Sequence, residues 1–325
     1  MTDLVSGLFN KDLEMKATRD GFGEGLVEIG SRDKKVVVLT GDLADSTRVA
    51  KFGEAFPERF FEMGVAEQNM MGVAAGLALS GKIPWVSSYA TFSPGRNWDQ
   101  LRVSVAYSEA NVKVAGAHAG LSVGPDGATH QAMEDIAMVR VLPNMTVVVP
   151  CDSLETKKAT LALTKLIGPV YLRFGREKTP VFTTASTPFQ IGRAEIFRPG
   201  EDLTIIGCGA LVYECLKAAD ELRSEGISAQ VINCHTIKPI DFKTISHAAA
   251  ETGAVVTVEE HQINGGLGGA VAEVLAKHYP VPQEFVGMPD HFGESGQPEE
   301  LLEKWEMTSK YIIQKSKLAL ARKRR

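Results

Sequence analysis

The sequence predicts an α/β protein of two domains, each with a largely parallel sheet. Short apolar runs rich in β-branched residues alternate with helical patterns along the chain, and this alternation is typical of parallel strands joined by helices. A Thr- and Pro-rich stretch interrupts the alternation between residues 177 and 200, after which it restarts. A length of 325 residues suits two domains. We therefore expect one domain over residues 1–190 and a second over residues 191–325.

The first half of the chain begins its sheet with Lys35–Thr40 (KVVVLT), a β-branched run that stops at the turn residues Gly41 and Asp42. The segment Glu67–Leu79 is expected to be a helix. It is rich in Gly and Ala, which indicates close packing against another helix of this chain or of a partner. Further elements are expected as strands over residues 83–88, 112–117, 146–149 and 169–174, and as a helix over residues 153–166 that Ser153 caps.

The second half repeats the same alternation. Strands are expected over residues 203–208, 229–233 and 254–258, and helices over residues 213–225, from residue 241, and over residues 270–278. The segment 264–269 (NGGLGG) precedes the last of these helices, where its amides could face an anion. Its glycines do not match the spacing of GxGxxG or GxxxxGK[ST] loops, so a tight strand-to-helix turn is expected instead.

The composition excludes several classes of function. Charged residues make up 23% of the chain and the formal net charge is −5, which gives no reason to expect nucleic acid or an anionic membrane as a partner. Neither a signal-peptide pattern nor an apolar run of about 18 residues occurs, so no membrane-spanning helix is expected. The four cysteines lack CxxC spacing, which favours buried thiols in a reducing cytoplasm over disulfides or zinc.

A single carboxylate, Glu67, stands where a loop meets the small-residue helix. A carboxylate at this position can simply complement the helix dipole. A carboxyl group packed among apolar residues, however, has a raised pKa unless it finds a donor, and such groups are frequent at functional sites. Both interpretations of Glu67 stay open on these residues alone.

The segment Ala117–Gln131 (AHAGLSVGPDGATHQ) places two histidines and an aspartate in a glycine-containing loop after an apolar strand. These residues are His118, Asp126 and His130. Open α/β sheets bind their ligands in loops of this kind, and glycines let a ligand approach the backbone. Metal binding is a competing use, but no third histidine or acidic cluster with ligand spacing is present, so no metal site is expected. Two incidental surface histidines are the remaining alternative.

Three stretches together resemble one enzyme family. They are GVAEQNMMGVAAGLALSG (residues 64–81), SSYATF (87–92) and HAGLSVGPDGATHQAMEDIAMVRVLPNMTVVVPCD (118–152). In this order they resemble the pyrimidine-binding domain and substrate loop of transketolases, and they are nearly as similar to the C-terminal half of deoxyxylulose-phosphate synthase. Residues from about 203 onward resemble the C-terminal domain of the same families. The resemblance therefore covers essentially the whole chain and points to the C-terminal subunit of a split transketolase.

The resemblance implies thiamine diphosphate as the cofactor and assigns residues to it. Glu67 matches the glutamate that hydrogen-bonds the pyrimidine ring nitrogen, a charge-assisted contact worth about 1.5–3 kcal/mol. Phe92 matches the aromatic residue that stacks on the pyrimidine ring. Leu43 is placed beside the cofactor, and Trp98 is expected to substitute for one of the further aromatic residues that transketolases usually carry after Phe92.

The same resemblance assigns the histidine loop to the substrate. His118 and His130 match the catalytic pair of histidines that contact the oxygens around the substrate carbonyl. Asp126 matches the aspartate that binds a substrate hydroxyl. The loop would therefore provide polar groups suited to a sugar.

The phosphate of the sugar is assigned to arginines and one serine. Arg19 and Ser46 match residues that grip it. Arg176, in the RFGRE stretch, matches the arginine of the phosphate site, and Arg173, three residues away, is the alternative register. Arginine suits this role because its planar fork binds phosphate oxygens bidentately. Arg96 resembles an arginine of the synthase, which leaves the preferred substrate open. Each of these arginines could instead form a surface ion pair.

One motif of the family is missing. Full-length enzymes hold the diphosphate and its divalent ion with a GDG…N segment, whereas here Gly41-Asp42 precedes Leu43 and Asp126-Gly127 follows Pro125. The resemblance therefore implies a partner N-terminal subunit that carries this segment and holds Mg²⁺. The assembly would contain two copies of each chain (α2β2), with the small-residue face of helix 67–79 in the interface. The chain alone would be inactive.

The activity that the resemblance implies is transfer of a two-carbon ketol unit from a ketose phosphate to an aldose phosphate. Two alternatives use the same cofactor. A deoxyxylulose-phosphate-synthase-like chain is favoured by Arg96 and the AEQ triplet, and the beta subunit of a 2-oxo acid dehydrogenase decarboxylase is disfavoured by the paired histidines. A non-catalytic subunit that keeps the fold is a further alternative. The joint presence of Glu67, His118 and His130 speaks against it.

Overall fold

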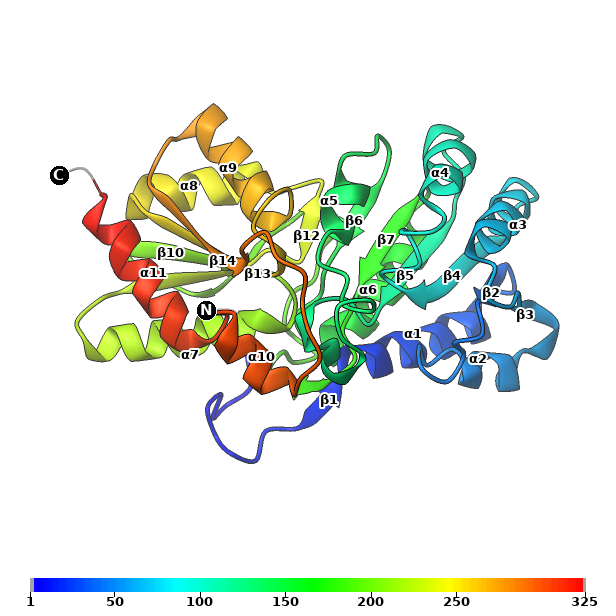
Figure 1. Ribbon diagram of the computed structural model, residues 1–325, viewed down its shortest axis with the longest axis horizontal. Helices are drawn as coiled ribbons and strands as arrows, with labels where there is room; N and C mark the ends of the chain where they lie inside the picture. The colour runs from blue at the N-terminus through cyan, green and yellow to red at the C-terminus, as the bar shows by residue number, and fades with distance from the viewer. Residues whose placement is uncertain (1–2, 324–325) are drawn as a thin grey trace.

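The computed structural model describes residues 3–323, in which two α/β units lie side by side (Figure 1). The first unit is built on a seven-stranded sheet. In spatial order, its strands are β12 (Thr236–Lys238), β6 (Thr146–Val148), β7 (Val170–Arg173), β5 (Lys113–Ala117), β4 (Ile83–Tyr89), β2 (Val36–Thr40) and β3 (Phe60–Glu62). All neighbours in this sheet run parallel except β12, which is antiparallel to β6.

The second unit is built on a five-stranded sheet. In spatial order, its strands are β14 (Gln283–Met288), β13 (Val255–Gln262), β10 (Leu203–Gly207), β11 (Ala229–Asn233) and β9 (Glu195–Arg198). Only β9 is antiparallel to its neighbour in this sheet. A separate antiparallel pair joins β1 (Met15–Ala17) to β8 (Lys178–Pro180). The predicted architecture, α/β with two mostly parallel sheets, is confirmed.

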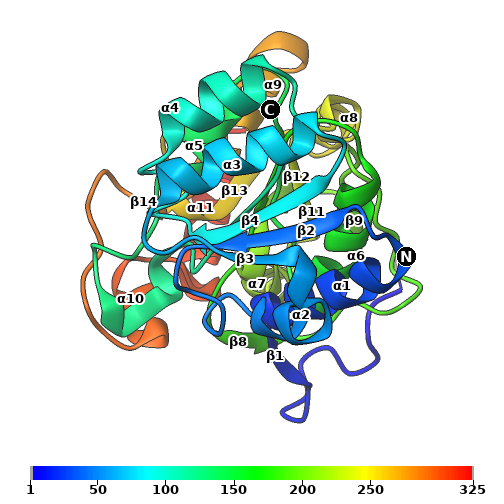
Figure 2. The same cartoon turned by 90° about the vertical axis from the view of Figure 1, so that its right-hand side faces the viewer.

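Helices cover both faces of the first sheet (Figure 2). One face carries α1 (Thr18–Arg32), α2 (Ala50–Ala55) and α6 (Ser153–Lys165), and the other carries α3 (Glu67–Leu79), α5 (Asp135–Arg140) and α4 (Trp98–Gln100) with its π-helical continuation η2 (Leu101–Tyr107). The central strands are therefore covered on both sides. Every residue of β2 and β5 is buried, which explains the runs of apolar or small residues over 36–39 and 114–117.

The second sheet is covered in the same way. Helices α7 (Val212–Ser224) and α11 (Ser309–Ala321) pack together on one face, and α8 (Phe242–Thr252) and α9 (Leu267–His278) on the other. The short helix α10 (Pro298–Lys304) reaches back to the first unit and packs against η3 (Leu121–Asp126). Two further single turns are η1 (Pro57–Arg59) and η4 (Gly209–Leu211).

Most predicted elements are present with ends shifted by one or two residues. The cap predicted for the helix after residue 152 is wrong. Asp152 is its N-cap, with a side-chain oxygen that accepts the Glu155 N–H at 2.8 Å. Helix α9 begins inside the predicted glycine turn because the Glu259 carboxylate accepts the N–H groups of Leu267 and Gly268, each at 2.7 Å.

Strand β12 comes from the second half of the sequence but joins the edge of the first sheet, next to β6. The two units are thus connected by backbone pairing as well as by packing. The division at residue 190 stays our proposal, since it separates the sheets but not this strand.

Two predictions from the composition concern the cysteines and membrane-spanning helices. All four cysteines are buried and none forms a disulfide, as expected for structural thiols. Within residues 3–323, no helix combines the length and apolar character needed to cross a membrane.

Candidate active site

Parallel strands of the first sheet end at one edge, and the residues that follow them form the candidate site. The strand ends are Thr40 (β2), Glu62 (β3), Tyr89 (β4), Ala117 (β5) and Arg173 (β7). Because these neighbouring strands are parallel, the loops at their carboxyl ends meet at the same edge. The sequence-predicted site residues lie in or near these loops, although they are far apart along the chain.

Glu67 is the first residue of α3, and its side chain is 3% exposed. Its carboxylate finds a donor in Arg96, with 3.1 Å between Glu67 Oε1 and Arg96 Nη1. The same guanidinium lies over the Phe92 ring, 4.1 Å from the ring centroid. One planar cation therefore stacks on the aromatic residue and bonds to the carboxylate, the two groups that the sequence assigns to a pyrimidine ring.

The structure opens a hollow of about 640 Å³ at this point, lined by residues 65–69 and Arg96. Asn97 ties the start of α3 to the turn after β4, since its amide donates to the Glu67 carbonyl at 3.2 Å and to Ser93 Oγ at 3.1 Å. The Asn97 amide thus fixes the backbone of Glu67, whose side chain lines the hollow. Such support for a single carboxylate is what a binding site requires.

Tyr89 is a site residue that the sequence reasoning did not single out. It stacks on His118, with ring centroids 4.0 Å apart, and also contacts Phe92 at 5.8 Å and His130 at 6.0 Å. Phe92 in turn meets His130 edge-on at 5.4 Å. The rings connect the expected cofactor side of the site to its substrate side. The signal was available, because Tyr89 is the Tyr of the quoted SSYATF motif and ends β4.

His118 is buried, with a backbone φ of 52° in the left-handed region. Non-glycine residues rarely adopt this conformation, and such strain clusters at functional sites. Burial, together with the positive charges of Arg19 and Arg176, lowers the pKa of His118 to about 3. The imidazole is therefore neutral at pH 7.

The tautomer of His118 follows from its neighbour. Arg19 Nη1 lies 3.5 Å from His118 Nε2. Because a guanidinium only donates hydrogen bonds, Nε2 must be the acceptor and we assign the proton to Nδ1. This Nδ1 is buried without a hydrogen-bond partner among the described residues. A buried donor of this kind costs about 1–3 kcal/mol when it stays unpaired, which a ligand oxygen would relieve.

Three arginines surround this end of the site. Arg19, Arg48 and Arg176 all contribute positive charge at His118, and burial followed by Arg48 lowers the pKa of Arg19. Cations that repel one another in this way favour an anionic ligand. Arg48 was not anticipated; it lies in the loop after β2 at a φ of 67°.

The other predicted substrate residues contact these arginines. Arg19 Nη1 donates to the Ser46 carbonyl at 2.9 Å, so Ser46 meets Arg19 through its backbone. Asp126 is exposed and pairs with Arg176 at 3.2 Å. The Nδ1 of His130 lies 2.8 Å from the Thr129 hydroxyl. The structure thus brings both histidines, Asp126 and Arg176 to one side of the site.

Arg173 lies apart from this cluster and is buried. Its Nε donates to Asp135 at 2.8 Å and its Nη2 to the carbonyls of Ala132 and Glu260 at 3.1 and 2.9 Å. Burial alone would lower the pKa of Arg173, but the Asp135 carboxylate raises it above its ordinary value. With its guanidinium bound inside the protein, Arg173 is poorly placed to hold a phosphate, and Arg176 is the better assignment.

Leu43 and Trp98 border the site without a contact that defines a role. Leu43 lies in the loop after β2 and is half-buried, and its carbonyl accepts the Thr47 N–H and hydroxyl at 2.9 Å each. The Trp98 indole N–H donates to the Met138 carbonyl at 3.2 Å, and its ring packs against the core under α3. Their contact with a cofactor stays a prediction.

A metal site was not expected from the sequence. In the part of the chain that the structure describes, no group of three or more His, Cys, Asp or Glu side chains is arranged to hold a metal ion. The candidate site therefore offers a carboxylate, aromatic rings, neutral and cationic nitrogen donors, but no ligand set of its own for a divalent ion.

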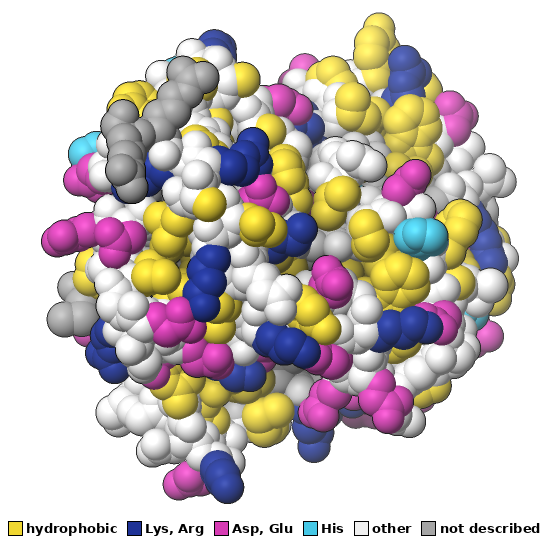
Figure 3. Space-filling view, turned by 60° about the vertical axis from the view of Figure 1, so that its left-hand side comes forward, with side chains coloured by type: hydrophobic (Ala, Val, Ile, Leu, Met, Phe, Trp, Pro, Cys, Tyr) yellow, Lys and Arg dark blue, Asp and Glu magenta, His cyan; other side chains and the backbone are white. Residues whose placement is uncertain are grey.

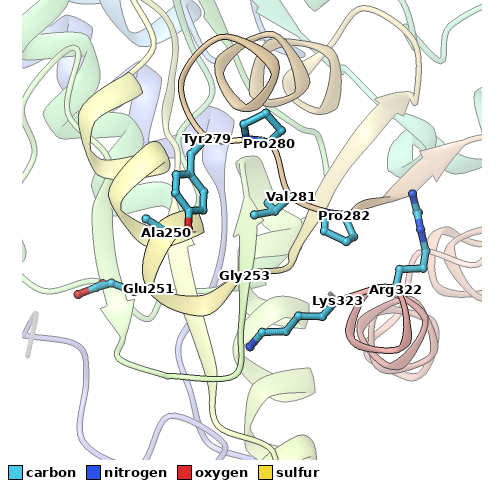
Figure 4. A pocket seen from close by; sticks show the side chains of 9 residues that line it. All are labelled: Ala250, Glu251, Gly253, Tyr279, Pro280, Val281, Pro282, Arg322 and Lys323. Atoms are coloured by element: carbon cyan, nitrogen blue, oxygen red, sulfur yellow. The ribbon is translucent and has the colours of Figure 1, made fainter. Parts of the chain in front are cut away.

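The second unit contains another cavity, of about 600 Å³, between the end of α8, the segment 279–282 and the end of α11 (Figure 4). Its basic side chains already have partners: Lys323 donates to the Asp202 carbonyl at 3.2 Å, and Arg322 pairs with Glu284 at 2.5 Å. Acidic and basic side chains are interspersed over the neighbouring surface (Figure 3). This cavity lacks the convergent polar groups that distinguish the edge of the first sheet.

Comparison with known families assigns both parts of the chain. Residues 14–181 match the family described as "Transketolase, pyrimidine binding domain", and residues 192–312 match "Transketolase, C-terminal domain". The two matches leave residues 182–191 between them.

Similar proteins cover nearly the same length. A "Putative transketolase C-terminal section" of Methanocaldococcus jannaschii is 46% identical over 92% of this chain and 95% of that protein. A "6-deoxy-6-sulfo-D-fructose transketolase subunit" of Clostridium sp. is 41% identical over 94% of this chain and 95% of that protein. A solved structure, "Split gene transketolase, inactive beta4 tetramer", has a TM-score of 0.87 and 45% identity, covering 95% of this chain and 99% of that one.

Proposed function

Since the chain belongs to the transketolase family, we propose that it is the subunit of a split transketolase that activates thiamine diphosphate. With a partner subunit, it transfers a two-carbon ketol unit from a ketose phosphate to an aldose phosphate. The observation that carries this proposal is the arrangement of Glu67 and Phe92 around one planar nitrogen cation, beside the paired histidines.

The residues present fit the pyrimidine end of thiamine diphosphate. An aminopyrimidine protonated on its ring nitrogen is flat and presents an N–H donor in its plane, and the Arg96 guanidinium shares these two properties. Arg96 already stacks on Phe92 and bonds to Glu67, and its half-exposed side chain can move away. Glu67 would then hold a proton at the pyrimidine nitrogen, and Phe92 would hold the ring face. When bound, the cofactor supplies the electron sink for the two-carbon unit.

The histidine side of the site would bind the sugar. Neutral His118 offers the unpaired Nδ1–H to an oxygen at the reacting end of the substrate, with His130 beside it. Asp126 would accept a hydrogen bond from a sugar hydroxyl. The Tyr89 ring, which packs against both histidines, would exclude water from the reacting carbon.

The arginine cluster supports an anionic group at the far end of the substrate. We assign this group to Arg19, Arg48 and Arg176, with Ser46 holding the Arg19 guanidinium in place. A relative is described as acting on a sulfo sugar, and sulfonate and phosphate oxygens suit the same arginine fork. Arg96, once displaced from Glu67, is available to the substrate as well. Kinetics with phosphorylated and sulfonated ketoses distinguish the two anions.

A partner subunit is needed because this chain provides only part of a thiamine diphosphate site. We propose that an N-terminal subunit with a GDG motif holds the diphosphate and Mg²⁺, and that two copies of each chain assemble in a reducing cytoplasm. The outer face of α3 supports this assembly. Gly72 and Gly76 face open space, with exposed Val73 and Leu79 beside them, and nearby Tyr107 is 82% exposed.

The experiment is to assay the chain with and without an N-terminal subunit that carries GDG…N, in the presence of thiamine diphosphate and Mg²⁺. We expect cleavage of xylulose 5-phosphate only with both chains present. Turnover by this chain alone would overturn the requirement for a partner. Decarboxylation of pyruvate without ketose cleavage would instead favour the deoxyxylulose-phosphate-synthase-like or 2-oxo acid dehydrogenase alternatives.

A further inference from the structure

The loop that carries the substrate residues has little regular structure of its own. Residues 118–131, here called the substrate loop, contain only the short turn η3 and pass through left-handed glycines at positions 120, 124 and 127. Both histidines and Asp126 belong to this loop. Something outside it must therefore fix the positions of these side chains, since short irregular loops are otherwise mobile.

Glu260 of the second unit contacts this loop from within the protein. It lies in β13, is 8% exposed, and its carboxylate accepts the backbone N–H of Ser122 in a short hydrogen bond. The approach is close: a Cβ atom at Gly120 would lie 2.6 Å from the Glu260 carboxyl carbon. The φ of +92° at Gly120 also favours glycine, so the loop backbone passes close to the carboxylate.

A second contact holds the other end of the loop. The Gln131 side-chain amide donates to the Leu121 carbonyl at 3.1 Å, within the loop, and to the Glu294 carbonyl at 2.9 Å, in the second unit. Glu294 lies in the segment between β14 and α10, which runs along the substrate loop (Figure 1). A Cβ atom at Gly293 would lie 1.9 Å from Gln131 Oε1, so this segment also approaches the loop as closely as glycine allows.

Arg173 links these contacts to the core of the first unit. Its guanidinium bonds at once to Asp135, to the Ala132 carbonyl just after the loop, and to the Glu260 carbonyl. The backbone of Glu260 is thus anchored to the first sheet while its carboxylate holds Ser122. Residues fixed at both ends in this way can hold a site to within about 0.5 Å.

We propose that the second unit positions the substrate loop for catalysis, with Glu260 as the positioning residue that acts through the Ser122 N–H. Glu260 does not touch the substrate; it sets the backbone between His118 and Asp126. Misplacement of reacting groups by about 1 Å can cost about 100-fold in rate. This role rests on the proposed function for its catalytic consequence but not for its structural one.

The test compares the same substitution at two adjacent residues of β13. Glu260→Gln and Glu260→Ala weaken or remove the contact with Ser122. Glu259→Gln weakens a carboxylate that accepts the N–H groups of Leu267 and Gly268 and lies 3.8 Å from His261 Nδ1, all in the second unit. Amide hydrogen exchange of the purified chain reports the loop directly. We expect Ser122 to exchange about 10- to 150-fold faster in Glu260→Ala, the fold-change of a lost charge-assisted hydrogen bond. Glu260→Gln should fall in between and Glu259→Gln should match wild type.

The second readout is made in the assembled two-subunit enzyme. We expect Glu260→Ala to lower kcat/KM for the ketose at least about tenfold while thiamine diphosphate binding is unchanged, because Glu67 and Phe92 lie outside the loop. Equal exchange of Ser122 in Glu260→Ala and wild type would overturn the proposal. So would equal loss of kcat/KM in Glu260→Gln and Glu259→Gln, which would indicate general destabilisation.

A second variant keeps the positioning role testable, and one outcome separates that role from the proposed transketolase activity. If Glu260→Ala fails to fold, Gln131→Met removes the bridge to Glu294 and must then accelerate exchange in the loop, or the proposal is wrong. Faster exchange in an assembly that cleaves no ketose at all in its wild-type form would support the positioning role and refute the proposed function.

Discussion

Replacing Glu67 by Gln tests the centre of the proposed site. The substitution keeps the size of the side chain but removes the charge that would hold a proton at the pyrimidine nitrogen. In the free chain, it breaks a pair whose partner, Arg96, is 49% exposed, and such partly exposed pairs contribute no more than about 1 kcal/mol. We therefore expect Glu67→Gln to fold and to assemble with the partner subunit.

The effect on the bound cofactor should be much larger. Loss of a charge-assisted hydrogen bond of about 1.5–3 kcal/mol weakens binding about 10- to 150-fold, measured by calorimetry with thiamine diphosphate and the assembled enzyme. Loss of positioned proton transfer lowers kcat about 100- to 10,000-fold, which corresponds to about 2.7–5.4 kcal/mol in the barrier. The assay is cleavage of a ketose phosphate at saturating cofactor.

Glu58→Gln is the matched control for this prediction. Glu58 also forms a 3.2 Å pair with an arginine, Arg59, but its side chain is 70% exposed and lies outside the site. This variant should keep wild-type binding and rate. If Glu67→Gln retained kcat within about threefold of wild type, Glu67 would have a structural role and the assignment of the cofactor to this edge would be refuted.

Three further predictions concern other groups. Arg176→Ala should raise KM for a phosphorylated ketose about 10- to 150-fold with a smaller change for an unphosphorylated ketose; equal effects on both would remove the phosphate from this site. Asp135→Asn leaves the buried Arg173 without its carboxylate partner, so urea unfolding should show that the free energy of unfolding falls by about 3–5 kcal/mol. An unchanged unfolding midpoint would contradict the structural role of this ion pair. His235 is buried, and burial lowers its pKa to about 3. Because its folded pKa lies below the unfolded value of 6.5, its stabilising contribution is complete above pH 6.5 and is lost as the pH falls. Between pH 7 and 5, wild type should thus lose about 2 kcal/mol more unfolding free energy than His235→Asn; parallel losses would mean that His235 is charged in the folded protein.

The parts of the fold that follow local rules were predictable from the sequence. The helix Glu67–Leu79 and the strand Ala229–Asn233 were predicted with the limits they have, since a turn and a change of hydrophobic pattern mark both ends. Helix α1 was missed because glycines, which are poor helix formers, recur along it. They serve close packing on α6: a Cβ atom at Gly21 would lie 1.8 Å from the Ser153 carbonyl oxygen, and one at Gly25 would lie 2.8 Å from Thr160 Cβ. Only the tertiary contact explains these residues.

The candidate site also combines residues that sequence motifs predict with residues that only tertiary contacts identify. Motifs led to Glu67, Phe92 and the histidine loop, because their order along the chain is distinctive. They could not distinguish Arg173 from Arg176, which are three residues apart. The distinction depends on where β7 ends: Arg173 is its last residue and turns into the protein, while Arg176 follows the turn and reaches Asp126.

The contact between Arg96 and Glu67 bears on why a partner would be required. In the free chain, Arg96 neutralises the carboxylate and covers the Phe92 ring, so a cofactor must displace a cation–π contact and an ion pair before it binds. An exposed cation–π contact is worth only about 0.5–1 kcal/mol, and the half-exposed pair adds no more than about 1 kcal/mol. Together they lower cofactor affinity by at most about 30-fold. This barrier is too small to keep the chain inactive by itself, so inactivity of the isolated chain would have to come from the missing diphosphate and metal contacts. An Arg96→Ala variant that remains inactive without the partner, yet binds the cofactor more tightly with it, would separate these two effects.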